Sequence, residues 1–129
     1  MYLTFDSETT GLPKNFKAPI SDSENWPRLV QLAWQINDKE GKLINNKSFL
    51  IKPDNFTIPY NSEKIHGIST QIALEKGIGL IIALKDFEED LKKCKYIIGH
   101  NINFDKNILG AEFYRNNVKS DLLNKISID

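Results

Sequence analysis

The chain has 129 residues, 40% hydrophobic and 26% charged, which favours a single globular domain. Its 17 basic and 17 acidic residues give a net charge of zero, which argues against gripping duplex nucleic acid through a broad basic surface. One cysteine, no signal peptide and no apolar stretch of membrane-spanning length predict a cytoplasmic protein without a membrane partner.

Alternating residues predict three strands in the first half of the chain. Residues 2–8 form the first, with Leu3 and Phe5 on one face. Residues 29–37 and 43–52 predict a hairpin. Between the first two strands, residues 14–28 show no periodicity, and structureless loops of this length are uncommon unless they are functional.

The second half of the chain predicts helices and two more strands. The helical segments are 61–75, interrupted at Gly67, then 79–94 and 102–117. The strands are 96–99 and 125–128. We expect the acidic run 88–90 to face solvent and Asn101 to cap the last helix. The order predicts an α/β fold, a mixed five-stranded sheet flanked by helices, antiparallel in its first three strands and parallel afterwards.

Two carboxylates stand close together on the first strand. Asp6 and Glu8 are two residues apart, so they share a face and their Cα atoms lie about 6–7 Å apart. Mg²⁺ and Mn²⁺ favour such hard oxygen ligands, and a pair of these ions can clamp a phosphodiester. Two acids on a solvent-facing strand need no function. The tight turn at residues 9–12, however, can offer backbone N–H groups to a phosphate.

A third carboxylate follows the short strand at 96–99. Asp105 lies near the start of the helix that begins after Asn101. The helix dipole alone favours an acid at this position. Alternatively, Asp105 is a third metal ligand, delivered from across the sheet. Both interpretations stay open on these residues alone.

The chain resembles a known family. The sequence at residues 5–12 is similar to the first motif of the DEDD exonucleases, and His100-Asn101 with Phe104-Asp105 resembles the second. Residues 26–31 and 65–69 are similar to family segments in the expected order. The resemblance covers essentially the whole chain. It points to the DEDDh branch, with the proofreading epsilon subunit of DNA polymerase III and ribonuclease T, and implies a ribonuclease H-like fold.

The resemblance also implies a role for each matching residue. The catalytic residues, which would bind two Mg²⁺ or Mn²⁺ ions, are Asp6, Glu8 and Asp105. The substrate-binding residues are Thr9, Thr10, Gly11, Leu12, His66 and Phe104. The turn would hold the 3′-terminal nucleotide, with its leucine against the base and the histidine near the sugar. Two roles have structural alternatives: the histidine as a residue beside a turn glycine, the phenylalanine as core.

The third motif of the family, a His followed five residues later by an Asp, has no match. His100 and Asp105 have that spacing, but they lie in the segment that resembles the second motif. We therefore expect a single exonuclease domain, residues 1–129, incomplete at its C-terminus and weak or inactive in hydrolysis. We also expect an uncovered sheet face that favours self-association. Asp129 matches a strand-end position, where it would cap a following helix.

The expected partner is the 3′ end of single-stranded DNA or RNA, with a DNA polymerase subunit as a further partner. Water would attack the last phosphodiester and release a nucleoside monophosphate. One alternative is a non-catalytic module that keeps the fold and binds a nucleotide or a protein partner. Another is an unrelated metal-dependent phosphoesterase, which requires Asp6, Glu8 and Asp105 to lie far apart.

Overall fold

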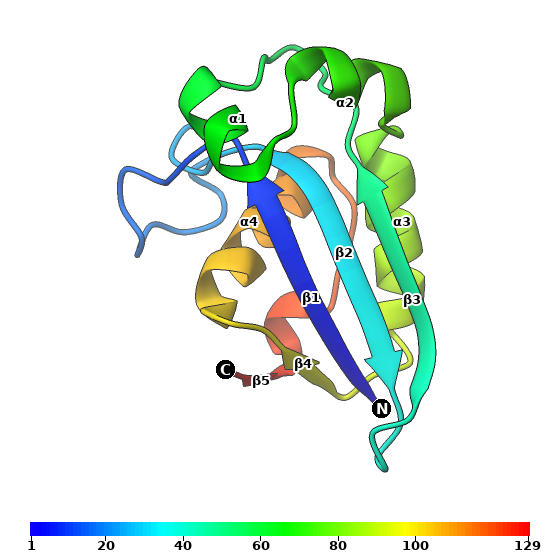
Figure 1. Cartoon of the computed structure of the whole chain (residues 1–129). Coiled ribbons are helices and arrows are strands. Elements are labelled where there is room, and N and C mark those ends of the chain that lie inside the picture. The colour runs from blue at the N-terminus through cyan, green and yellow to red at the C-terminus, as the bar shows by residue number, and fades with distance from the viewer.

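The computed structural model describes residues 1–129, the whole chain, and has a five-stranded sheet at its centre (Figure 1). The strands, in sheet order, are β3 (Leu43–Leu50), β2 (Leu29–Asn37), β1 (Tyr2–Thr9), β4 (Tyr96–Ile98) and β5 (Ile126–Ile128). β1, β2 and β3 pair antiparallel, whereas β4 pairs parallel with both β1 and β5. This confirms the predicted mixed sheet of the ribonuclease H-like kind.

Four α-helices and one short 3₁₀ helix surround the sheet. They are α1 (Tyr60–His66), α2 (Thr70–Lys76), α3 (Leu80–Leu91), α4 (Ile102–Arg115) and η1 (Leu122–Asn124), of which η1 was not predicted. The predicted break is confirmed, because Gly67 ends α1 with a φ of 76° and donates its N–H to Glu63. Figure 1 shows α3 and α4 behind the sheet, and α1 and α2 beyond the end of β1.

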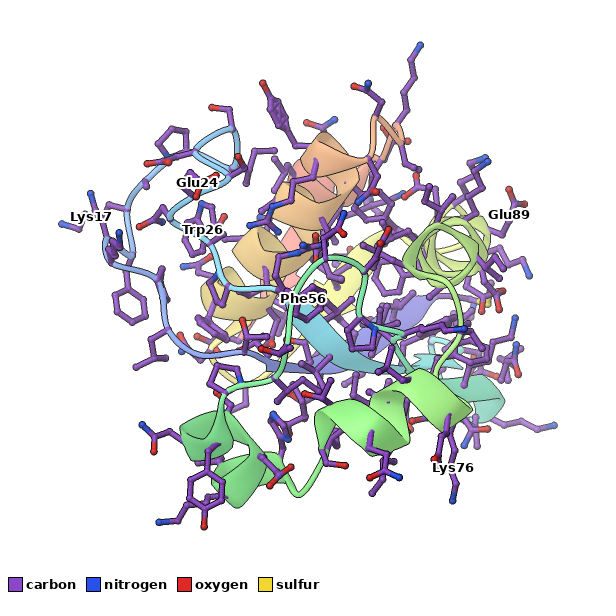
Figure 2. The ribbon with its side chains drawn as sticks, turned by 90° about the horizontal axis from the view of Figure 1, so that it is seen from above. Lys17, Glu24, Trp26, Phe56, Lys76 and Glu89 are labelled. Atoms are coloured by element: carbon purple, nitrogen blue, oxygen red, sulfur yellow. The ribbon has the colours of Figure 1, made fainter.

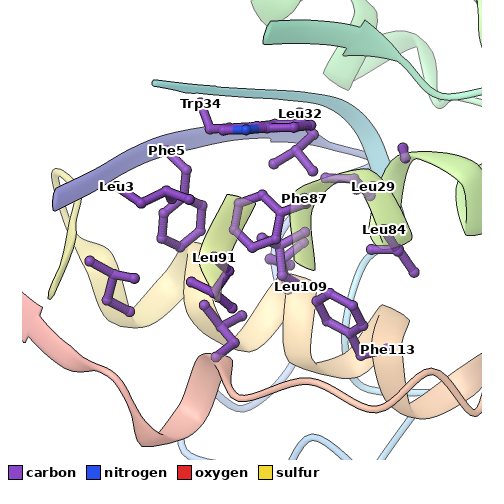
Figure 3. Packing of buried hydrophobic residues seen from close by; sticks show 14 of the residues in the cluster. Leu3, Phe5, Leu29, Leu32, Trp34, Leu84, Phe87, Leu91, Leu109 and Phe113 are labelled. Carbon is purple, nitrogen blue, oxygen red and sulfur yellow. The ribbon is translucent and has the colours of Figure 1, made fainter. Parts of the chain in front are cut away.

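The core fills the space between the sheet and the pair α3 and α4 (Figure 3). Alternate residues of β1 and β2 point into it, as the period of two requires. Phe87 of α3 lies at its centre, with its ring edge-on to Phe5 at 5.5 Å and to Trp34 at 5.3 Å. Phe87 also lies 6.5 Å, ring centroid to ring centroid, from Phe113 of α4. The core therefore packs α4 against the sheet and determines where it places its polar side chains.

The expected solvent exposure of the acidic run 88–90 is wrong for two of its three residues. Glu88 and Asp90 are buried, and only Glu89 is exposed. Asp90 accepts a hydrogen bond of 2.8 Å from the Trp34 indole, and Glu88 accepts one of 2.6 Å from the Ser120 hydroxyl. Residues two apart on a helix point to different sides. Here each of the two acids binds a donor on a distant segment, Ser120 for Glu88 and Trp34 for Asp90.

The opposite face of the sheet carries no helix over β4 and β5. Tyr2 stacks on Tyr96 there, with ring centroids 5.1 Å apart. Ile126 and Ile128, which pair in register with the β4 residues of this face, are 49% and 39% exposed. The expectation of an uncovered face is confirmed, whereas self-association through it stays a prediction. None of the helices combines the length and apolar character needed to span a bilayer.

Candidate active site

β1 directs its two acids away from the core. Leu3 and Phe5 are buried, so the alternating positions of Asp6 and Glu8 face the open side of the sheet. Asp6 is exposed and lies opposite Ala33 of β2, a side chain too small to cover it. It borders a groove of about 680 Å³ that crosses this face. The two carboxylates therefore share an accessible face, as predicted.

Asp105 reaches β1 from α4. Its side chain is buried, and its Oδ1 accepts a short hydrogen bond from the hydroxyl of Ser7, the residue between Asp6 and Glu8. Burial raises the pKa of Asp105 to about 6; the negative charges of Asp6 and Glu8 act in the same direction, and hydrogen bonding by Ser7 opposes them. Asp105 is therefore attached to β1, near enough to Asp6 and Glu8 for their charges to act on its carboxyl.

The electrostatics of these three acids favour a bound cation. Asp6, Glu8 and Asp105 form no ion pair, so no basic side chain offsets their mutual repulsion. Oxygen donors with uncompensated negative charge fit a divalent metal ion. The chain presents no preformed group of three His, Cys, Asp or Glu ligands, so metal binding requires these carboxylates to move closer together.

The turn after β1 is held by its own side chains and by β2. The Thr9 hydroxyl donates to the Gly11 carbonyl at 2.8 Å. The Thr10 N–H donates to the carbonyl of Arg28, and the Arg28 N–H donates back to the Thr10 hydroxyl at 2.9 Å. The Leu12 side chain is 74% exposed beyond the turn. The turn is therefore a fixed backbone segment that ends in an exposed apolar side chain.

Helix α1 fastens the same turn from another side. The Ser62 hydroxyl donates to the Thr10 carbonyl at 2.7 Å. The His66 Nε2 lies 3.2 Å from the Thr9 carbonyl, and His66 Nδ1 accepts the N–H of Ile68. The carbonyl can only accept, so Nε2 carries the proton. His66 thus contacts the turn directly, and both of its ring nitrogens are engaged.

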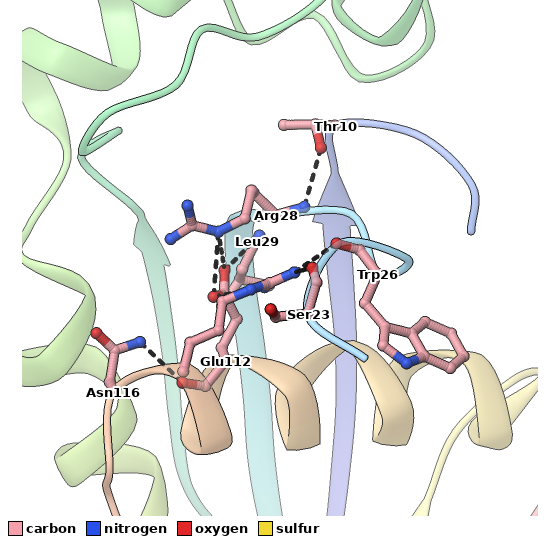
Figure 4. Close-up of polar contacts among 8 residues, drawn as sticks. Thr10, Ser23, Trp26, Arg28, Leu29, Glu112 and Asn116 are labelled. Carbon is pink, nitrogen blue, oxygen red and sulfur yellow. Dashed lines mark hydrogen bonds and ion pairs between the residues drawn. The ribbon is translucent and has the colours of Figure 1, made fainter. Parts of the chain in front are cut away.

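A buried ion pair that sequence reasoning missed joins α4 to this turn (Figure 4). Glu112 has no exposed surface, and it accepts hydrogen bonds from the Arg28 guanidinium, the Leu29 N–H and the Arg115 guanidinium. Arg28 also lies over the Phe56 ring, with its guanidinium carbon 4.6 Å from the centroid. The sequence feature that could have revealed this ion pair is an acidic residue among the apolar residues of α4.

Glu112 and Asp105 lie on the same side of α4, because seven residues are close to two helical turns. Near the start of α4, Asp105 accepts a hydrogen bond from Ser7 of β1. Near its end, Glu112 binds Arg28, which is hydrogen-bonded to Thr10. The helix therefore sets the strand acids and the following turn in register with each other.

Asn101 holds the predicted N-cap position of α4 without the expected side-chain cap, and Asp129 contacts its backbone. Asn101 occupies the N-cap position of α4, but its side chain makes no capping hydrogen bond, and its φ is 56°. Its own N–H donates to the Asp129 carboxylate at 2.8 Å. Asp129 therefore supports the entry to α4. A local pattern cannot reveal this contact, because the two residues are 28 positions apart in the chain.

Phe104 fits both of its predicted environments. It is partly buried and packs against the core, while its ring lies 6.4 Å from the exposed ring of Phe16. His100 is exposed and borders the same groove as Asp6. The structure thus brings the predicted site residues to one end of β1 and the start of α4.

Comparison with known proteins agrees with this geometry. Residues 3–126 match the RNase T family, described as exonuclease. The chain is 35% identical over 132 residues to the PolC-type DNA polymerase III of Mycoplasmopsis pulmonis, covering 99% of this chain and 8% of that protein. The chain therefore spans a small part of that relative.

Solved structures give the same result. Exonuclease I of Escherichia coli in complex with a dT13 oligonucleotide matches with a TM-score of 0.78 and 25% identity, over 99% of this chain and 27% of that one. A zinc-bound form of the same enzyme with single-stranded DNA matches with a TM-score of 0.79, 25% identity and the same coverage. The chain thus belongs to the RNase T exonuclease family, in agreement with the resemblance of its first two motifs to those of the DEDD exonucleases.

Proposed function

We propose that the chain forms the catalytic core of a 3′→5′ exonuclease that releases nucleoside monophosphates from single-stranded DNA or RNA with two Mg²⁺ or Mn²⁺ ions. The observation that carries this proposal is the hydrogen bond between Ser7 and Asp105, because it joins the helix acid to the strand that carries Asp6 and Glu8. The oligonucleotide complexes of exonuclease I support the substrate class, and the PolC-type relative supports a DNA polymerase as partner.

Each part of the site has a distinct task in this proposal. Asp6, Glu8 and Asp105 hold the cations. Bound divalent ions would supply positive charge at the attacking and leaving oxygens of the phosphodiester. The turn from Thr9 to Leu12 holds the terminal nucleotide, and the Leu12 N–H, which has no acceptor within the chain, can donate to it. His66 keeps the turn in place beside the terminal sugar.

Hydrolysis by these 129 residues is expected to be slow. A general base contributes about 10²–10⁴-fold to a reaction of this type. His66 cannot serve as one without breaking its bonds to Thr9 and Ile68. His100 is the other histidine of the chain, and it lies in the segment that matches the second motif.

Calorimetric titration with Mn²⁺ in the presence of thymidine monophosphate tests the proposal. We expect two ions per chain, and we expect Asp6→Ala to lose at least one of them. Asp54→Ala, which removes an exposed carboxylate, serves as the matched control and should bind as the wild type does. Absence of ion binding to the wild type would contradict the proposal. Rapid release of mononucleotides, abolished by Asp6→Ala, would contradict only the expected slow hydrolysis.

A non-catalytic module on the same fold is the second candidate. It is favoured by the lack of a preformed three-ligand metal group. Such a module would bind a nucleotide or a protein partner without metal. Thymidine monophosphate binding that is equal in Mn²⁺ and in chelator would favour this candidate over the exonuclease.

A further inference from the structure

The loop between β1 and β2 holds an aromatic ring in solvent beside the candidate site. Phe16 is 55% exposed, and its ring lies 6.4 Å from that of Phe104 at an interplanar angle of 41°. Phe104 immediately precedes Asp105 on α4. Leu12, at the start of the loop, is also exposed. Three apolar side chains from two segments therefore present partly exposed surface next to the acids.

The backbone around Phe16 is fixed by a buried amide. The Asn25 side chain, 8% exposed, accepts the Asn15 N–H at 2.8 Å and donates to the Asn15 carbonyl at 2.9 Å. The Asn15 side chain in turn accepts the Lys17 N–H at 2.9 Å. Hydrogen bonds thus hold the residues on both sides of Phe16. The exposed ring therefore belongs to a hydrogen-bonded segment of the loop.

The far side of the loop is fastened to the same helix. The Arg115 guanidinium of α4 donates to the carbonyls of Ser23 and Trp26. The Trp26 indole donates to the Pro19 carbonyl at 2.9 Å. In Figure 2, Lys17 lies at the outer margin of the loop, while Trp26 points inward. The loop and α4 thus form one rigid unit that carries both aromatic rings.

The charges around the ring suit a polyanion. Lys14 and Lys17 are exposed on either side of Phe16, and neither forms an ion pair. The acids of the loop, Asp22 and Glu24, lie further along it. An exposed aromatic ring flanked by free ammonium groups is the combination that binds single-stranded nucleic acid, through base stacking and phosphate contacts.

We propose that Phe16, supported by Phe104 and flanked by Lys14 and Lys17, is a subsite that stacks an unpaired base upstream of the 3′-terminal nucleotide. This proposal rests on the proposed function, because the terminal nucleotide is placed at the turn after β1. The subsite binds through its aromatic surface and is indifferent to base identity, since every base offers a stacking face.

Fluorescence anisotropy with a labelled thymidine dodecamer, in Mn²⁺, tests the subsite. We expect Phe16→Ala to bind the dodecamer about 10-fold more weakly than the wild type does. Thymidine monophosphate, which reaches only the terminal position, should bind both proteins equally. Phe16→Tyr should retain affinity, whereas Phe16→Leu should lose it. Tyr114→Ala removes a ring of α4 that is 50% exposed, and as a matched control should bind the dodecamer normally.

Two further measurements do not depend on the alanine variant. The emission of Phe16→Trp should be quenched by the dodecamer but not by thymidine monophosphate. Lys17→Gln should reduce the slope of log affinity against log salt by about 0.7, the value for one phosphate contact on a single strand. Unchanged emission with the dodecamer bound would overturn the stacking of a base on this ring.

The outcomes separate the two proposals. If the wild type binds the dodecamer and Phe16→Ala binds it equally well, the subsite is refuted while the exonuclease function stands. If the wild type binds neither dodecamer nor monophosphate, the proposed function fails and the subsite fails with it. Equal losses for Phe16→Ala and Tyr114→Ala would show a general effect on the helix and would also overturn the subsite.

Discussion

Replacing Asp105 by asparagine should stabilise the folded chain at neutral and alkaline pH. The carboxyl is buried, and burial raises its pKa from 3.8 to about 6. The folded state therefore holds the proton more tightly than the unfolded state does. The stability that this proton contributes is fully present below pH 3.8 and is lost as the pH rises through about 6. Asparagine cannot ionise, and its oxygen still accepts the Ser7 hydroxyl.

The size of this effect follows from the pKa difference. One pKa unit corresponds to about 1.4 kcal/mol, so the ionised carboxylate costs about 3 kcal/mol at pH 8. At pH 4.5 the same calculation gives a cost of about 1 kcal/mol for this carboxyl group. Asp105→Asn should therefore raise the free energy of unfolding by these amounts. The gain should fall by about 2 kcal/mol between pH 8 and pH 4.5.

Urea unfolding followed by tryptophan fluorescence measures the difference, since Trp26 and Trp34 are both buried. A chelator in the buffer prevents a cation from stabilising the wild-type carboxylate. Asp54→Asn, which neutralises an exposed acid, should leave the free energy of unfolding unchanged. A variant at Asp105 that is no more stable than the wild type at pH 8, or more stable by the same amount at both pH values, would contradict a raised pKa for this carboxyl.

The structure carries three further stability and assembly predictions. Glu112→Gln should lower the free energy of unfolding by about 3 kcal/mol in urea titration, because Arg28 and Arg115 lose a buried charged partner. Glu89→Gln, at the surface, should leave the free energy of unfolding unchanged. Trp34→Phe should cost about 1–3 kcal/mol by leaving buried Asp90 without its indole donor, and thermal unfolding would test this. Light scattering at high concentration should show self-association that Ile126→Lys reduces; a monomeric wild type would contradict it.

The elements with strong local patterns could be predicted from the sequence. β2 has the predicted bounds, Leu29–Asn37, because its apolar residues alternate without interruption. The break at Gly67 followed from the preference of glycine for a left-handed helix end. The grouping of Asp105 with the strand acids came from the family resemblance, because the residues alone also fitted an acid favoured by the helix dipole. The hydrogen bond from Ser7 shows that Asp105 is attached to β1.

The rest depends on contacts between distant segments. Glu112 binds Arg28, which is 84 positions away, and no local pattern in either segment announces the other. The side-chain cap expected at Asn101 is absent, and the Asn101 N–H donates to Asp129, 28 positions away in the chain. Both contacts form only when distant segments pack against each other. The periodicity of the sequence does not encode that packing.

Helix α4 is attached to the rest of the molecule at Asp105 and at Glu112. These two attachments fix the number of residues between them. Side-chain types there can drift, but adding one residue would rotate everything beyond it by about 100° around the helix axis. Either Asp105 would then lose its contact with Ser7, or Glu112 would lose its contact with Arg28. This stretch of the chain should tolerate substitutions far better than insertions or deletions.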